Sequence, residues 1–287
     1  MRRATRRRSL LEGGYPPYPP ECRCPKFLQE RSVHMPNDPL GAFYDRKYAG
    51  AAGGAGIRDV KITDTPNDRY QAAVKFFPRL FKAGHVLELG CGDGEVAKAL
   101  LWRHAEIESY TLGDISLPRV ERVRAGLQDA RAKCVLLNAE QIDPTMEARF
   151  DAVIMIALIE HLIDPLGAMR DIRRLIRPGG FVYLDTPNIA KYSRRLKLLA
   201  GYFPSTSSLN EGLTTYSGKP AELYDEGHLH YFTYRSLATM LTQFCGFSRV
   251  ERLWYPIGGH PLGSSTHEAL AKTWPAMFSE VVVAAWT

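Results

Sequence analysis

The sequence lacks any apolar run long enough to cross a membrane. Its longest apolar run, residues 152–159, is the length of one strand, whereas a membrane-spanning helix needs about 20 apolar residues. Hydrophobic residues make up 45% of the 287 residues and charged residues 24%, the balance typical of a globular chain. We therefore expect one large α/β domain with additions, or at most two small domains, and no membrane span.

Cysteine is also scarce. The five cysteines lie at positions 22, 24, 91, 134 and 245, an odd and scattered set that argues against a disulfide framework. Cys22 and Cys24 have no second Cys or His pair nearby to complete a tetrahedral zinc site. These features predict a reduced, cytoplasmic protein without a structural metal.

A folded basic surface is missing as well. The net charge is +6, but five arginines lie within residues 2–8, and the rest of the chain carries only about +1. Nucleic-acid binding requires Lys and Arg clustered on one folded face, and no clear cluster of this kind follows. Residues 1–38 are rich in proline and are predicted to form a disordered basic tail. Residues 9–20 lack the apolar core of a secretory signal, whereas a mitochondrial presequence and a start at Met35 both stay open.

What the sequence does contain is a regular alternation of strand-sized and helix-sized segments. Strands are predicted at 85–89, 109–113, 133–137, 150–155, 180–185, 248–254 and 279–285. Helices are predicted at 94–102, 117–130, 166–176 and 234–245. This alternation is typical of a doubly wound, mostly parallel sheet with helices on both faces.

Two further segments are predicted to form a helical lid. Residues 39–80 contain a short aromatic helix, a flexible Gly/Ala stretch and an amphipathic helix at 68–81, which Pro78 is expected to bend or end. Residues 189–225 interrupt the alternation and predict an inserted helix and mobile loop on the acceptor side of the main domain, residues 81–287. Arg194, Arg195 and Lys197 in this insert could bind an acidic acceptor or form a solvated helix face.

A glycine-rich turn joins the first strand to the first helix of this pattern. Gly90, Gly92 and Gly94 allow the backbone to turn sharply and to approach a ligand closely, and the helix that follows offers free N–H groups. A dinucleotide-binding turn would have glycine at position 95, where this chain has Glu95. Glu88 also argues against a phosphate ligand and favours a cofactor that carries positive charge.

Polar residues end the next two strands. Asp114 can accept hydrogen bonds from ribose hydroxyls, as the acidic residue of a dinucleotide fold does. Asn138 ends the third strand and can pair with an adenine edge. Together with the glycine turn, these residues predict an adenosine-containing cofactor.

These segments resemble class I S-adenosylmethionine (SAM) dependent methyltransferases over roughly residues 81–255. E-L-G-C-G-D-G at 88–94 resembles their first motif, Y-T-L-G-D-I-S at 110–116 their second, and I-E-H-L-I-D-P at 159–165 the loop after the fourth strand. The resemblance implies a Rossmann-like sheet of seven strands, mostly parallel, with an antiparallel last strand and a helical lid. It extends to a subgroup that includes ubiquinone-biosynthesis O-methyltransferases and tailoring enzymes of natural products and glycans.

The resemblance also implies a set of cofactor-binding residues. They are Glu88, Gly90, Cys91, Gly92, Asp93, Gly94, Asp114, Ile115, Asn138, Ala139 and Ile156. The family usually has Asp where this chain has Asn138, so the adenine contact is expected to differ. Tyr44 and Tyr48 are expected either to close over the cofactor or only to pack.

Methyl transfer requires an acceptor held close to the sulfonium methyl group and shielded from water. A general base is needed when the acceptor is a hydroxyl or an ammonium group. His161 is the preferred base, because an ordinary histidine titrates near neutral pH. Glu160 and His230 are further catalytic candidates, and a purely structural Glu160–His161 pair is the alternative. The expected acceptor is an O or N atom of a small molecule.

Three other functions were weighed. Related enzymes that methylate the terminal ribose of small RNAs hold a metal with a Glu-x-x-Glu-His set and a later His. Here Ala157 replaces the first Glu, so no metal site is predicted, although Glu160 and His161 with His228 or His230 could form one. A non-catalytic binding module is the second alternative, and a NAD-dependent oxidoreductase, disfavoured by Glu95, is the third.

Overall fold

The computed structural model describes residues 39–49, 56–143, 145, 147–208, 210–215, 217–257 and 263–287. The predicted disordered tail at 1–38, the Cys22/Cys24 pair and most of the predicted Gly/Ala loop lie outside the described residues. Among the described residues, no helix combines the length and the apolar character that a bilayer crossing requires.

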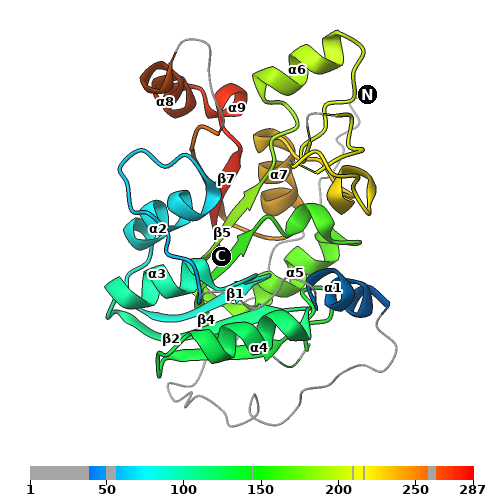
Figure 1. Cartoon of the computed structure of the whole chain (residues 1–287). Helices are drawn as coiled ribbons and strands as arrows, with labels where there is room; N and C mark the ends of the chain where they lie inside the picture. The colour runs from blue at the N-terminus through cyan, green and yellow to red at the C-terminus, as the bar shows by residue number, and fades with distance from the viewer. Residues whose placement is uncertain are drawn as a thin grey trace, which may run out of the picture. The chain divides into compact units, whose positions relative to one another are not determined.

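Seven strands form one sheet in the order β3-β2-β1-β4-β5-β7-β6, as expected (Figure 1). Strands β1 to β5 are parallel, and β7 lies antiparallel between β5 and β6. The strands are β1 Gly84–Leu89, β2 Ile107–Asp114, β3 Ala132–Leu136, β4 Phe150–Ile156, β5 Ile176–Thr186, β6 Arg249–Leu253 and β7 Val281–Trp286. The sheet confirms the predicted α/β architecture and the antiparallel last strand.

Helices cover both faces of this sheet because each presents an apolar stripe to it. On one face α5 (Pro165–Leu175) and α7 (Tyr234–Thr239) bury residues such as Ile172 and Leu237 in one core cluster. On the other face α2 (Arg69–Leu80), α3 (Glu95–Arg103) and α4 (Leu117–Gly126) contribute residues such as Phe77 and Leu100 to a second cluster. Burial of these side chains is the main stabilising term of the domain.

Several predicted boundaries need correction. Helix α2 begins at the Asp68 cap, whose side chain accepts a hydrogen bond from the Gln71 N–H, and it continues past Pro78 to Leu80. Pro78 lacks the N–H that would donate to the Val74 carbonyl, and the helix continues for only two residues beyond it. Helix α4 ends at Gly126, earlier than predicted, because Asp129 binds the Arg131 backbone and guanidinium in a separate turn. The apolar face of α2 is part of the core, whereas α1 (Pro39–Ala49) of the predicted N-terminal lid lines the cavity described below.

The second half of the chain contains elements that the sequence pattern did not predict. Helices α8 (Ser264–Thr273) and α9 (Pro275–Phe278) lie between β6 and β7, and a π-helical turn at Met240–Phe244 follows α7. The insert contains α6 (Tyr192–Leu199), as predicted. Its loop was expected to be mobile, but Ser205, Thr206, Ser207 and Ser208 are buried.

Candidate functional site

The glycine turn brings the backbone of β1 against the end of β2. The N–H groups of Gly90 and Cys91 both donate to the Gly113 carbonyl, at 2.8 and 3.1 Å. Gly90 has φ +67°, and a Cβ there would lie 3.2 Å from the Leu158 side chain. A residue with a side chain would therefore be strained at position 90 and would narrow the space in front of the turn.

A cavity opens in front of this turn, at the carboxyl ends of the parallel strands. Ligands bind at this edge in open α/β sheets. The predicted site residues in its wall are Gly90, Asp114, Ile115, Asn138, Ala139 and His161. The other residues in the wall are Leu40, Tyr44, Lys47, Arg119, Leu137, Glu140, Ala157, Leu158, Leu162 and Glu226.

The polar groups in this wall are held in place and keep acceptor capacity. The two oxygens of Asp114 accept backbone N–H bonds from Gly92 and Ser116, at 3.0 and 2.9 Å. Each oxygen keeps a lone pair that a ribose hydroxyl could use. Burial raises the pKa of Asp114, while these two hydrogen bonds and Arg119 act in the opposite direction. Asn138 Oδ1 accepts from the Glu140 N–H at 2.9 Å, which fixes its amide at the cavity.

Helix α1 contributes the opposite wall. Leu40, Tyr44 and Lys47 face the cavity, and the Asp45 carboxylate accepts the Leu117 N–H at the start of α4 over 2.9 Å. Tyr44 is thus placed where a cofactor lid was predicted, whereas the side chain of Tyr48 lies outside the described structure. The capping bond anchors α1 to the helix that follows Asp114.

Six predicted cofactor residues are not among the described residues that line this cavity. Glu88 is buried behind the turn, where it accepts a 2.7 Å hydrogen bond from the Tyr110 hydroxyl. The side chain of Asp93 instead pairs with Arg122 at 3.2 Å. The remaining members are Cys91, Gly94 and Ile156, all buried. The Gly92 N–H reaches the site indirectly, through Asp114.

Glu160 and His161 lie in a single 3-10 turn, Ile159–His161, just after β4. Glu160 is buried, and its Oε2 accepts the Thr186 hydroxyl at 2.9 Å. His161 Nδ1 lies 3.1 Å from the Gly227 carbonyl. Because a carbonyl only accepts, Nδ1 carries the hydrogen and Nε2 keeps its lone pair. Burial and, to a smaller extent, the nearby His228 lower the pKa of His161 to about 4, so the ring is neutral at pH 7.

His228, rather than His230, is the second histidine beside His161. The ring centroids of His161 and His228 are 4.7 Å apart, whereas His230 Nε2 lies 3.3 Å from the Ile163 carbonyl. One ligand atom each of Glu160, His161 and His228 lies within 4.8 Å of the others. A carboxylate and two imidazoles at this separation fit the donor set of a divalent transition metal.

Asp225 connects the insert to these residues. It is fully buried, its φ is +47°, and its carboxylate accepts the hydroxyls of Ser205, Thr206 and Ser207. These bonds hold the pKa of Asp225 well below its usual range. His228 Nδ1 lies 2.5 Å from the Thr206 hydroxyl and 3.7 Å from Asp225 Oδ2. The insert loop and His228 are therefore held by one buried carboxylate.

Two charged residues near Glu160 were not predicted from the sequence. Asp185 is the penultimate residue of β5, and Arg69 begins α2. Arg69 Nε lies 3.9 Å from Asp185 Oδ1, and both Asp185 and Glu160 raise the pKa of Arg69 against the effect of burial. Position at a strand end was the available signal for Asp185, whereas nothing local marked Arg69.

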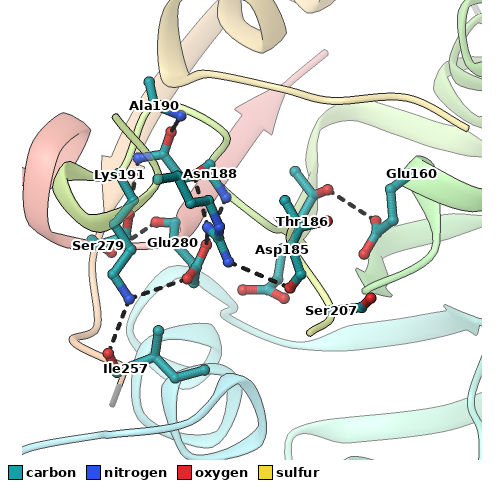
Figure 2. Close-up of polar contacts among 12 residues, drawn as sticks. Glu160, Asp185, Thr186, Asn188, Ala190, Lys191, Ser207, Ile257, Ser279 and Glu280 are labelled. Carbon is teal, nitrogen blue, oxygen red and sulfur yellow. Dashed lines mark hydrogen bonds and ion pairs between the residues drawn. The ribbon is translucent and has the colours of Figure 1, made fainter. Parts of the chain in front are cut away.

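The basic residues of the insert have different environments: Arg195 is exposed on α6, as the solvated-face hypothesis predicted, whereas Arg194 lies inside. Arg194 Nη1 lies 2.7 Å from Glu280 Oε2, and Lys191 Nζ lies 3.3 Å from Glu280 Oε1 (Figure 2). These cations, with a hydrogen bond from the Asn188 N–H, lower the pKa of the fully buried Glu280 to about 2 despite the opposite effect of burial. Arg194 is thus part of an internal ion cluster that fixes the start of the insert.

Comparison with known proteins identifies the family of the chain. A family model described as a methyltransferase domain matches residues 65–251, more than half of the chain. The ubiquinone biosynthesis O-methyltransferase of Pseudomonas aeruginosa is 33% identical over 106 residues, which cover 36% of this chain and 44% of that protein. The match thus spans less than half the length of this curated relative.

Solved structures share the fold at low sequence identity. A putative methyltransferase solved in complex with a methyltransferase activator from Haloferax volcanii has a TM-score of 0.54 and 14% identity, and the match covers 87% of this chain and 98% of that one. The SAM-dependent methyltransferase SibL has a TM-score of 0.51 and 16% identity, with coverage of 76% and 54%. With the matched family model, the chain belongs to the methyltransferase domain family.

Proposed function

We propose that this methyltransferase transfers the methyl group of SAM to an O or N atom of a small molecule. The observation that carries the proposal is one cavity whose wall runs from Gly90, Asp114 and Asn138 to His161. Residues suited to binding an adenosine and a histidine suited to removing a proton therefore line the same cavity. Methyl transfer requires this proximity.

The cofactor residues suit an adenosyl group in three respects. Asp114 would accept the ribose hydroxyls with the lone pairs that its two backbone bonds leave. Asn138 would contact the adenine edge, and Ile115, Leu137 and Leu162 would pack against the ring. SAM supplies a methyl group on a sulfonium, which is already a good leaving group. The protein's part is to hold the acceptor in line and to exclude water.

His161 is proposed to accept the acceptor's proton when the acceptor is a hydroxyl or an ammonium group. Its Nδ1–H is directed to the Gly227 carbonyl, which leaves Nε2 as the basic atom. Its lowered pKa keeps the ring unprotonated at physiological pH, but it also makes His161 a weaker base than the ordinary histidine that the sequence predicted. Glu160 would support this turn, and His230 is a weaker candidate because its ring is directed to Ile163.

The proposed lid consists of α1 and the insert at 189–225, which would enclose the acceptor from two sides. α1 supplies Tyr44 and Lys47 to the cavity wall, and the end of the insert supplies Asp225, which holds His228 close to His161.

The test combines binding with product identification. Calorimetry of the full chain should detect SAM binding that Asp114→Ala removes. A labelled-SAM screen against metabolite extracts, followed by mass spectrometry, should then show a methylated small molecule. Absence of SAM binding by the wild-type chain would favour the binding-module alternative. Binding without any labelled product in the extracts would contradict a small-molecule acceptor.

A second candidate, metal-assisted methylation of RNA, is favoured by the Glu160, His161 and His228 cluster. These residues would hold a divalent ion, which would lower the pKa of an acceptor hydroxyl. Chelation by EDTA should then abolish activity, Mn²⁺ or Mg²⁺ should restore it, and label should enter small RNA in preference to metabolites. Full activity in EDTA would exclude this candidate.

A further inference from the structure

Two buried carboxyl groups lie side by side where β4 and β5 end. Ile156 pairs with Asp185 in the sheet register, and the Ala157 N–H donates to the Asp185 carbonyl at 3.0 Å. Glu160 follows in the next turn and accepts the hydroxyl of Thr186, the neighbour of Asp185. Figure 2 shows the Asp185 and Glu160 side chains on either side of Thr186. This pair lies beside His161, on the side of the site away from Asn138.

Too few hydrogen-bond donors surround the oxygens of these two carboxyl groups. Asp185 and Glu160 are each 1% exposed. Within the described part of the chain, neither carboxylate oxygen of Asp185 has a hydrogen-bond partner, and nor does Oε1 of Glu160. The Tyr255 hydroxyl is buried close enough to Asp185 to lower the pKa of that carboxyl as a donor, although its geometry is outside that of an ordinary hydrogen bond, and it can serve one oxygen at most. Buried polar atoms are nearly always paired in folded proteins, so unpaired oxygens at a ligand-binding edge point to a missing partner.

The local charge balance also lacks a cation. Arg69, with its Nε 3.9 Å from Asp185, compensates one of the two carboxylates. The nearby cations of the insert, Lys191 and Arg194, are bound to Glu280. Consistent with this, burial raises the pKa of Asp185 to about 7, although Arg69 lowers it. An incoming carboxylate or phosphate would meet two acidic groups, whereas a group rich in N–H or O–H donors would satisfy them.

We propose that Asp185 and Glu160 bind the methyl acceptor through clustered hydrogen-bond donors, either adjacent hydroxyls or an ammonium group, and that they select against anionic acceptors. The inference rests on the proposed function and narrows its acceptor class. The donors would occupy the two Asp185 oxygens and Glu160 Oε1, which places the reacting atom of the acceptor next to His161. Asp185 is then a specificity-determining residue that touches the acceptor.

The test uses the full chain saturated with S-adenosylhomocysteine and two matched sets of probes. Glucosamine, glucose and glucuronate share one ring and differ in an ammonium, a hydroxyl and a carboxylate. Dopamine, catechol and 3,4-dihydroxybenzoate make the same comparison on an aromatic ring. Saturation-transfer NMR should detect the ammonium or diol members of at least one set and not the carboxylate members. The set that binds identifies whether the donors belong to a saccharide or to an aromatic ring.

The variant Asp185→Asn should weaken binding of the preferred probe about tenfold or more. Asp171→Asn, which removes a partly exposed carboxylate from the outer part of α5, should leave binding unchanged. Thermal unfolding checks that both variants fold. If Asp185→Asn does not fold, the order in which the wild-type chain binds the probes still tests the proposal. Preference for the carboxylate probes, binding of no probe, or an unchanged affinity in a folded Asp185→Asn variant would overturn the proposal.

Calorimetry with S-adenosylhomocysteine on the same samples separates the two levels of inference. Loss of this binding in the wild-type chain would contradict the proposed function itself. Normal binding together with a preference for anionic probes would contradict only the assignment of Asp185 and Glu160.

Discussion

The Tyr110 hydroxyl donates to Oε2 of Glu88 over 2.7 Å, behind the glycine turn, and both side chains are buried. Burial raises the pKa of Glu88 to about 8, so the carboxyl group is mainly protonated at pH 7. Glu88 therefore supports the turn from behind as a neutral hydrogen-bonded group. Glu88, the acidic residue of the first motif, therefore has a structural role in this chain.

The variant Glu88→Gln tests this assignment through the pH dependence of stability. A carboxyl whose pKa is raised on folding keeps its proton in the native state, so its contribution is present below pH 4.5 and is lost as pH rises towards 8. Glutamine cannot ionise, so the free energy of unfolding of the variant should fall less than that of the wild type over this range. At about 1.4 kcal/mol per pKa unit the difference is up to several kcal/mol. Denaturant unfolding from pH 5 to 8.5 measures it.

The exposed Glu121→Gln on α4 is the matched control and should behave as the wild type does. Identical slopes for Glu88→Gln and the wild type would show that Glu88 is ionised in the folded chain.

Asp114→Ala should weaken SAM binding about 10- to 100-fold. The variant removes the carboxylate that faces the cavity and also the partner of the Gly92 N–H, which shapes the turn. Calorimetry measures the affinity, and circular dichroism checks the fold. Glu121→Ala, on the solvent side of the same region, should bind SAM normally. Equal affinities for the two variants would remove Asp114 from the cofactor site.

Glu280→Gln should destabilise the chain by about 3–5 kcal/mol at pH 7, because it leaves Lys191 and Arg194 as buried cations without their counterion. The lowered pKa of Glu280 makes its contribution present above pH 4.5 and lost as pH falls towards 2, so the variant should also be less sensitive to acid. Urea unfolding at pH 7 and pH 3 tests both effects. The exposed Glu251→Gln on β6 should change neither value, and a neutral effect of Glu280→Gln would show that the ion cluster adds no net stability.

Asp225→Asn should release the insert loop without unfolding the sheet. The Thr206 and Ser207 N–H groups donate to the Asp225 carboxylate, and neutralising it weakens these bonds. Hydrogen exchange measured by mass spectrometry should be about tenfold faster at 205–208 and unchanged in β1 and β4. Asp143→Asn, an exposed carboxylate that caps the Thr145 N–H, should leave exchange at 205–208 unaltered. Unchanged exchange in Asp225→Asn would mean that other contacts hold the loop.

The sheet could be predicted because its signals are local. Most strands of the sheet are short apolar segments, and the glycine turn, Asp114 and Asn138 each lie at or just after a strand end. The carboxyl ends of parallel strands lie at the same edge of a sheet. The positions of Gly90, Asp114 and Asn138 at strand ends were therefore enough to predict that they share one cavity. Helices α8 and α9 were missed, because the segment between β6 and β7 gave no clear periodic pattern.

The candidate chemistry could be predicted only in part, because it depends on contacts between distant segments. His228 and His230 are equivalent in the sequence, and the structure distinguishes them by the bonds from Asp225 and Thr206 to His228. The pairing of Arg194 with Glu280 joins positions far apart in the chain, and no local pattern indicates it. Glu88 was assigned to the cofactor from its place in a motif, whereas its environment is set by Tyr110 on the next strand.

The place of β7 in the sheet has a consequence for biosynthesis. β7 is the last of the seven strands to be translated, yet it lies between β5 and β6 and bonds to both. Until it leaves the ribosome, β5 has an open edge and β6 has no neighbour in the sheet. The nascent chain therefore exposes hydrogen-bonding groups and apolar side chains of β5 and β6 until β7 pairs with them. During that interval chaperone binding would protect it from aggregation, and a premature stop before β7 would leave a chain without a closed core.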